Sequence, residues 1–229
     1  MRSSVSVALL VSTLAACAVP HDDTPSATPA DTGKPNPASD AADPTSHPPA
    51  EIDGYPVGPF GMKVGNTFPN LALDGYRDGK GEWTTLTLKD YYDPDASHGI
   101  RGLYLTISAP WCAGCVAEAK VLPGAYASKY RELGAKLLTA LAQDASSKPA
   151  TRNTVDTWVS TYKINFDIVA DPTLSTAPKD ASGGGSIALP YNYVIDPRTM
   201  KIVHINSGPF FTGGAIPGLD ELLAKNAAK

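Results

Sequence analysis

Apolar and polar positions alternate with two different periods along residues 71–226, which predicts a succession of strands and helices. The clearest strand is expected over residues 101–108, where apolar residues occupy both faces: Leu103, Tyr104, Leu105 and Ile107. A strand that is apolar on both faces is typical of a sheet covered by two layers. The clearest helix is expected over residues 151–162, where one face carries Val155, Trp158, Val159 and Tyr162.

The remaining pattern predicts further elements, namely strands at 71–73, 83–88, 166–169, 190–196 and 201–206, and helices at 112–133 and 216–226. Residues 135–142 are expected to form a strand because they follow a helix and its expected C-cap, Gly134, although their pattern alone would also fit a helix. Turn residues fill 74–81, a short helical turn is expected at 89–93, and residues 171–189 form a long loop. Pro123 and Gly124 should kink or split the helix in which they lie. Alternating strands and helices that end in a hairpin and a helix indicate an α/β domain with a mixed sheet.

The first 17 residues have the character of an export signal. Arg2 precedes an uncharged apolar run at residues 5–14, which is too short to cross a bilayer as an anchor. The run ends in small residues before Cys17, which resembles the signal of bacterial lipoproteins. We therefore expect export, cleavage before Cys17 and attachment of lipid to its sulfur, with an ordinary secretory signal as the alternative. Ala18, in place of Asp, favours sorting to the outer membrane.

Residues 18–54 are expected to be a flexible tether. They contain eight prolines, seven acids and a single Lys or Arg, Lys34, and too few apolar residues to form a core. The acidity of the chain, whose formal net charge is −4, belongs to this tether, because residues 55–229 carry 17 bases and 16 acids. Residues 55–229 are predicted to be one globular domain, and its near neutrality gives no indication of nucleic-acid binding.

The candidate chemistry lies where the central strand meets the following helix. Trp111 is followed by Cys112 and Cys115, which have CxxC spacing and fall in the expected first helical turn. Unpaired N–H groups and the helix dipole at that place favour a thiolate. We therefore expect the pKa of Cys112 to lie below the ordinary thiol value of about 8.5. Cys112 would attack a disulfide, and Cys115 would resolve the mixed disulfide.

The same pair has two other interpretations. A CxxC can be half of a zinc site, although no histidine pair with ligand spacing accompanies it here. It can also be a purely structural disulfide, although so small a ring stabilises a fold little. The chain has three cysteines, and if Cys17 carries lipid only the CxxC pair remains. An exported domain with one CxxC and no disulfide framework favours a redox-active pair.

Residues 62–226 resemble a thioredoxin fold of the redoxin or TlpA/ResA type. The resemblance rests on WCAGC after the central strand, on LPYNYVID at residues 189–196, and on the strand pair that precedes the central strand. It implies a thioredoxin-like three-layer α/β/α domain with a mixed central sheet and an added N-terminal strand pair.

The resemblance also implies roles for individual residues. Pro190 matches a proline that is cis in this family and faces the CxxC, which leaves the backbone of Leu189 to bind an extended client. Glu118 matches a glutamate that would exchange protons with Cys115, with a solvated helix glutamate as an equal alternative. Thioredoxins instead bury an aspartate at the position that Thr106 occupies here.

Two features of the CxxC segment leave questions open. Trp111 either shields the sulfurs and helps to bind clients or simply packs in the core. Ala113 and Gly114 separate the cysteines, where reducing relatives have proline and oxidising relatives have histidine. The sequence therefore leaves the redox potential open.

Together these features predict a membrane-tethered thiol–disulfide oxidoreductase that faces the periplasm and acts as a monomer without cofactor or metal. Its partners would be exported client proteins with disulfides and a membrane electron donor that keeps it reduced. One alternative is a peroxiredoxin-like thiol peroxidase, which would require threonine where Ala109 stands. Another is a copper-binding thioredoxin-fold chaperone, for which His204 is the only histidine in the region of the last hairpin.

Overall fold

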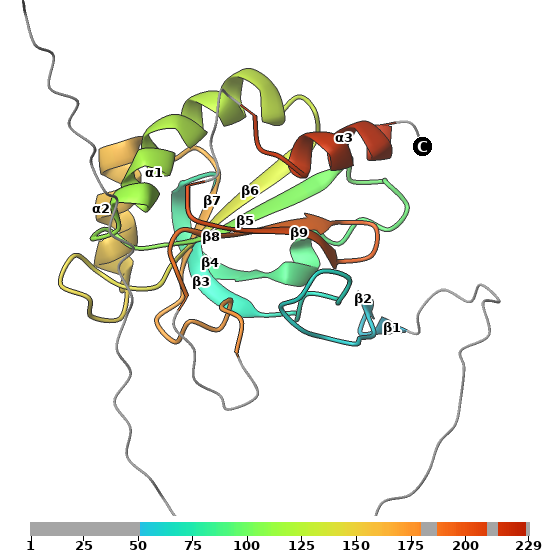
Figure 1. The fold of residues 1–229 in the computed structure, drawn as a ribbon, viewed down its shortest axis with the longest axis horizontal. Coiled ribbons are helices and arrows are strands. Elements are labelled where there is room, and N and C mark those ends of the chain that lie inside the picture. The colour runs from blue at the N-terminus through green and yellow to red at the C-terminus, as the bar shows by residue number, and fades with distance from the viewer. Residues whose placement is uncertain (1–50, 180–186, 210–214, 228–229) are drawn as a thin grey trace, which may run out of the picture.

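The protein is built on a seven-stranded sheet in the order β4-β3-β7-β6-β5-β8-β9 (Figure 1). The structure, a computed structural model, describes residues 51–179, 187–209 and 215–227. The strands are β3 (Ala72–Arg77), β4 (Lys80–Thr87), β5 (Gly102–Ser108), β6 (Ala135–Leu141), β7 (Asp167–Ala170), β8 (Tyr191–Asp196) and β9 (Lys201–Ser207). A separate two-stranded ribbon pairs β1 (Glu51–Ile52) with β2 (Tyr55–Pro56).

The sheet is mixed, as the order of elements predicts. Strands β5, β6 and β7 run parallel, whereas β8 and β9 form the predicted antiparallel hairpin beside β5. The added hairpin of β3 and β4 joins the other side through an antiparallel pairing of β3 with β7. All seven residues of β5 are buried, which its apolar pattern predicts. The thioredoxin-like α/β fold is therefore confirmed.

Three α-helices, α1 (Ala113–Ala125), α2 (Arg152–Tyr162) and α3 (Leu219–Ala227), cover one face of this sheet (Figure 1). Leu122, Trp158 and Leu222 from these helices share one core with Tyr104 of β5. Two right-handed crossovers that step in the same direction, from β5 to β6 and from β6 to β7, place α1 and α2 on the same face.

The other face is covered by the 3₁₀ turn η1 (Leu88–Tyr91) and by loops in place of α-helices. Tyr55, Phe68 and Tyr91 pack there against Leu103 and Leu105, the β5 side chains that point away from α1. The outer layer that the three-layer prediction requires on this face is thus present, but among the described residues it contains no α-helix.

The prediction of a loop over residues 74–81 was wrong for its first half. Strand β3 continues as far as Arg77, and the turn is confined to Asp78 and Gly79. Gly75 lies so close to β7 that an added Cβ would clash with the carbonyl group of Ile168. Pairing with both β4 and β7 overrides the turn-forming composition of this segment.

The helix that carries the cysteines runs through Pro123 without splitting. The irregularity comes directly after it, where Tyr126–Tyr130 form the π-helical turn η2. The C-caps of α1 and η2 are Tyr126 and Arg131, whereas Gly134, with φ of +79°, closes the turn at residues 131–134 that leads into β6.

The outer edge of β9 is partly covered by the loop before β3. The backbone N–H of Gly65 donates to Ile202 O at 2.8 Å, and Ile202 N–H donates to Asn66 O at 3.0 Å. Covering an edge strand in this way leaves fewer backbone groups free to pair with another chain.

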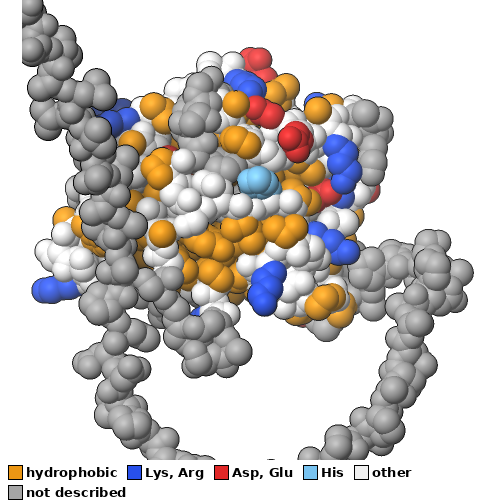
Figure 2. All heavy atoms as spheres, viewed as in Figure 1, with side chains coloured by type: hydrophobic (Ala, Val, Ile, Leu, Met, Phe, Trp, Pro, Cys, Tyr) orange, Lys and Arg blue, Asp and Glu red, His pale blue; other side chains and the backbone are white. Residues whose placement is uncertain are grey.

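On the face shown in Figure 2, basic, acidic and apolar side chains are interspersed, which agrees with the nearly neutral balance of this part of the chain.

None of the described helices is both long and apolar enough to span a bilayer. The signal segment with Cys17 and the tether up to residue 50 lie outside the described residues, and β1 lies within the range assigned to the tether. Residues 180–186 of the long loop are also outside. The segment boundaries at residues 17 and 54 therefore stay predictions.

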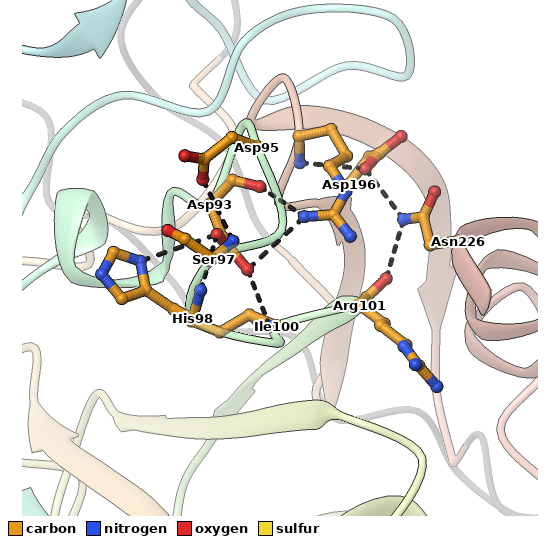
Figure 3. Close-up of polar contacts among 9 residues, drawn as sticks. Asp93, Asp95, Ser97, His98, Ile100, Arg101, Asp196 and Asn226 are labelled. Carbon is orange, nitrogen blue, oxygen red and sulfur yellow. Dashed lines mark hydrogen bonds and ion pairs between the residues drawn. The ribbon is translucent and has the colours of Figure 1, made fainter. Parts of the chain in front are cut away.

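A buried polar network ties the chain together at the start of β5, far from the cysteines (Figure 3). Asp93, with no exposed surface, accepts hydrogen bonds from the backbone N–H groups of His98 at 3.1 Å and Ile100 at 2.8 Å. Arg198, in the turn between β8 and β9, donates to Asp93 O at 2.6 Å and lies 3.4 Å from its carboxylate. Asn226 of α3 joins the same region through Arg101 O at 2.8 Å.

Replacing Asp93 by alanine is expected to lower the free energy of unfolding by about 3–5 kcal/mol, because the largely buried Arg198 would lose its carboxylate partner and the buried amide of Ile100 would lose its acceptor. The measurement is urea denaturation of the full chain and the variant. Asp95→Ala is the matched control, since Asp95 is an exposed acid two residues away whose hydrogen bonds are to the neighbouring Ser97. Equal stability of the two variants would contradict a structural role for the Asp93 network.

Candidate active site

The two cysteines sit at the junction of β5 and α1, as predicted. β5 ends at Ser108. Pro110 and Trp111 then turn the chain, and Cys112 is the N-cap residue of α1. The N–H of Cys115 donates to Cys112 Sγ at 3.2 Å. The sulfur thereby takes the place of the oxygen that normally caps a helix N-terminus.

The surroundings of the two thiols push their pKa values in opposite directions. A hydrogen bond from the Cys115 side chain, supported by the N–H groups of Cys115 and Gly114, lowers the pKa of Cys112 to about 7 against the opposing effect of burial. Burial, followed by the nearby Cys112 sulfur, raises the pKa of Cys115 well above its ordinary value. Cys112 is 7% exposed and Cys115 only 1%. Cys112 is therefore suited to be the nucleophile and Cys115 a protonated partner beneath it.

Glu118 lies under the thiols and is only 2% exposed, so the alternative of a solvated helix glutamate was wrong. Three side chains direct donors at its carboxylate from 3.4 Å: Tyr104, Thr106 and Asn192. Two of these belong to β5 and one to β8, so the sheet surrounds the carboxylate that α1 delivers. Negative charge on Glu118 is among the causes that raise the pKa of Tyr104 well above its ordinary value, after burial itself.

The position at which thioredoxins carry an aspartate is thus in contact with Glu118. Thr106 occupies that position on β5, and its hydroxyl reaches Glu118 Oε2. Glu118 of α1 therefore places a carboxylate where thioredoxins have one from the central strand.

Pro190 lies against the segment between the cysteines. Its peptide bond with Leu189 is cis, as predicted. A Cβ added to Gly114 would lie 3.0 Å from Pro190 Cδ and 2.9 Å from Pro209 Cγ, so a residue without a side chain is required between the cysteines at this point. The carbonyl of Pro190 accepts from Gly208 N–H at 2.8 Å. Among the described residues, the backbone N–H and C=O of Leu189 have no such partner.

The comparison with known families decides where this site belongs. The profile of the AhpC/TSA family matches residues 64–205, which is more than half of the chain. The chain belongs to the AhpC/TSA family. The match runs from before β3 into β9 and therefore contains both cysteines, Glu118 and Pro190. No curated protein matches the chain significantly.

Solved structures share the fold of this AhpC/TSA family member at low sequence identity. A secreted thiol-disulfide isomerase from Corynebacterium glutamicum aligns with 16% identity and a TM-score of 0.52, over 69% of this chain and 86% of its own. A putative protein disulfide isomerase from Bacteroides thetaiotaomicron gives 16% and 0.52, over 72% and 93%. A putative thiol:disulfide interchange protein DsbE from Chlorobium tepidum gives 20% and 0.50, over 72% and 97%.

The remaining predicted site residues are Trp111 and His204. The indole N–H of Trp111 donates to Oε1 of Gln143, on the loop after β6, at 3.0 Å, and this hydrogen bond fixes the ring beside the cysteines. His204 lies on β9 opposite Val194, against Gly218 before α3. The described residues contain no cluster of three His, Cys, Asp or Glu side chains that could hold a metal. The copper alternative thus lacks a gathered set of ligands within this part of the chain.

Three residues of the site escaped the sequence analysis: Ser108, Gln143 and Asn192. Asn192 is 1% exposed, and besides Glu118 it donates to Gly208 O at 3.2 Å, so it links the carboxylate to the loop that follows β9. Its signal in the sequence is a polar residue inside the otherwise apolar strand pattern of β8. Ser108 lies two residues after Thr106, so the period of two in a strand would have placed its side chain on the same face of β5.

Proposed function

We propose that this AhpC/TSA family member is a thiol–disulfide oxidoreductase that reduces disulfides in client proteins. The observation that carries the proposal is the asymmetry of the two thiols. Cys112 caps a helix, is the more exposed of the two cysteines and has a pKa lowered to about 7. Cys115 lies beneath it and stays protonated until it is needed. This asymmetry suits one attacking and one resolving cysteine.

The reaction transfers two electrons from the dithiol to the client. The Cys112 thiolate attacks one sulfur of the client disulfide, which forms a mixed disulfide and releases the other client sulfur as a thiolate. Cys115 then loses its proton and attacks Cys112 Sγ. The second client thiolate leaves, and a Cys112–Cys115 disulfide remains. A membrane electron donor would return this disulfide to the dithiol.

The client would bind along the surface that borders Cys112. The backbone groups of Leu189, which have no hydrogen-bond partner among the described residues, suit an extended segment that pairs as a short strand. A groove of about 320 Å³ begins at Pro110 beside the active site and follows α2. Its lining is rich in hydroxyl groups, including those of Thr154 and Thr157, with Trp158 and Tyr162 as its aromatic part. Both features favour a peptide over a small oxidant.

The cellular setting is part of the same proposal. The apolar run at residues 5–14 and the small residues before Cys17 support export and attachment of lipid to Cys17. The lipid would anchor the chain in the outer membrane, and the tether would hold the domain in the periplasm. A peroxidase of the same family is the second candidate. Ala109 argues against a peroxidase, because that activity would require threonine at this position.

The proposal is tested by a redox titration. The full chain with Cys17→Ala, whose only cysteines are Cys112 and Cys115, is equilibrated in thiol–disulfide buffers and its free thiols are trapped with a mass-shifting reagent. We expect a reversible two-electron transition nearer to about −270 mV, as in thioredoxin, than to about −120 mV, the value of a strong oxidant. Absence of any reversible disulfide would overturn the proposed function. Consumption of peroxide by the reduced chain would favour the peroxidase.

A further inference from the structure

Resolution of the mixed disulfide requires Cys115 to lose a proton in a place that solvent hardly reaches. Its side chain is 1% exposed, and burial raises its pKa. A nearby base must take the proton, and Glu118 is the buried carboxylate on the next turn of the same helix. The proton must therefore pass from Cys115 to Glu118, and this inference rests on the function proposed above.

Two hydroxyl groups lie between the thiol and the carboxylate. Ser108 and Thr106 are alternate residues of β5, so both point toward α1. Ser108 and Cys115 line the same internal gap, and the Ser108 hydroxyl is the smallest of the causes that act on the pKa of Cys115, which it lowers. It lies 3.4 Å from Thr106 Oγ1, which in turn lies 3.4 Å from Glu118 Oε2. All four side chains are buried.

The space around these groups leaves no room for a water relay. Cys115, Ser108, Thr106 and Glu118 line one internal gap, which is closed by apolar side chains that include Leu122. The gap has no volume that a water molecule could occupy, whereas an ordered water needs at least about 10–15 Å³ and several polar partners. The side-chain hydroxyls are therefore the groups in place to carry a proton.

We propose that Ser108 and Thr106 form a proton relay between Cys115 and Glu118. A hydroxyl can donate one hydrogen bond while it accepts another, which is what a relay requires. The thiol proton passes to Ser108 Oγ, the former Ser108 proton to Thr106 Oγ1, and the former Thr106 proton to Glu118 Oε2. Both hydroxyls end unchanged, Cys115 becomes a thiolate, and Glu118 becomes a carboxylic acid. The buried net charge stays constant, so no isolated charge is created in the core.

Neighbouring residues hold the far end of this relay. Tyr104 and Asn192 both direct donors at Glu118 Oε1, which leaves Oε2 to face Thr106. The contacts of 3.4 Å are longer than the usual O–H···O separation of about 2.7–2.8 Å. Hydrogen bonds of catalytic groups are commonly long in the free protein and tighten in the complex. The relay therefore requires these contacts to shorten when Cys115 reacts.

The test separates the two cysteine steps in one stopped-flow trace. The parent is the full chain with Cys17→Ala, and the probe is an aromatic disulfide whose released thiolate absorbs light. The first phase reports attack by Cys112, and the second reports attack by Cys115 on the mixed disulfide. We expect Thr106→Val and Ser108→Ala to slow the second phase by at least about tenfold, as the loss of a proton-transfer group does. The first phase should be unchanged.

Thr106→Ser is the matched control, because it keeps the hydroxyl but loses the methyl group. It should restore the second phase, which a packing defect would not do. A second phase of parental rate in both Thr106→Val and Ser108→Ala would overturn the relay. If Glu118→Gln alone then slowed that phase, direct transfer between Cys115 and Glu118 would replace it. Failure of the first phase in the parent would instead overturn the proposed function, so the two failures are distinguishable.

Discussion

Replacing Cys112 by serine is expected to abolish disulfide reduction completely. The serine hydroxyl is not ionised near neutral pH, so no nucleophile remains at the accessible position of the pair. Cys115 cannot take over, because it is 1% exposed and its pKa is raised by burial. The measurement is reduction of a protein disulfide by the full chain and its variants with a chemical reductant in excess. Activity of Cys112→Ser at the level of the parent would exclude the assignment of the nucleophile.

Cys115→Ser provides the complementary result. Attack by Cys112 remains possible, but the mixed disulfide cannot be resolved, so the variant should accumulate covalent complexes with its client. These complexes should appear on a non-reducing gel and disappear when reductant is added. Cys17→Ala should leave both activities unchanged in solution, since the proposed role of Cys17 is attachment to the membrane. Accumulation of complexes by Cys112→Ser in place of Cys115→Ser would show that the roles are reversed.

The reactivity of Cys112 is expected to rise with pH around a midpoint of about 7. Only the thiolate is nucleophilic, so the alkylation rate follows the deprotonated fraction and falls as pH drops through the pKa. At pH 6 the thiolate fraction should be roughly thirtyfold larger than for a thiol with the ordinary pKa of about 8.5, and the rate advantage is smaller because a thiolate of lower pKa is less nucleophilic. The measurement is the rate of iodoacetamide labelling of the reduced chain with Cys17→Ala, with mass spectrometry to assign the labelled residue.

A variant separates the sources of this shift. The Cys115 side chain is the main cause of the lowered pKa of Cys112, ahead of the backbone N–H groups. Cys115→Ala should therefore move the midpoint upward, while the amide contribution remains because the backbone of α1 is unchanged. A parental midpoint near the ordinary thiol value would contradict the capping geometry. An unchanged midpoint in Cys115→Ala would assign the shift to the helix N-terminus alone.

The position of Glu118 explains how the fold supplies a buried carboxylate without an aspartate in the central strand. One turn of α1 separates Glu118 from Cys115, so both side chains point at the sheet. Thr106 and Ser108 are small enough to leave the space that the carboxylate fills, and Asn192 reaches it from β8 across 74 positions of the sequence. The site thus depends on three elements meeting beneath the thiols.

The order of strands and helices was determined by the sequence itself, because a period of two or 3.6 is a local property of the chain. The pattern predicted β5, β7, the final hairpin and the three helices, and it placed Cys112 and Cys115 at a helix N-terminus. β6 was predicted from its position after a helix and a glycine, because its pattern alone would also fit a helix. The motif around Pro190 predicted a proline against the CxxC, which the structure confirms. The order of the elements requires no knowledge of distant contacts, whereas the contact of Pro190 with the CxxC segment was implied by the resemblance to the family.

Only the tertiary structure decided the surroundings of these residues. Glu118 has the same spacing whether its helix face is solvated or buried, and the packing of α1 on β5 and β8 resolves that ambiguity. β3 extends beyond its apolar residues because β4 and β7 pair with it from both sides. The gap that joins Cys115, Ser108, Thr106 and Glu118 exists only where a helix lies on a sheet. Burial and hydrogen bonding arise from long-range contacts, which a local pattern does not encode.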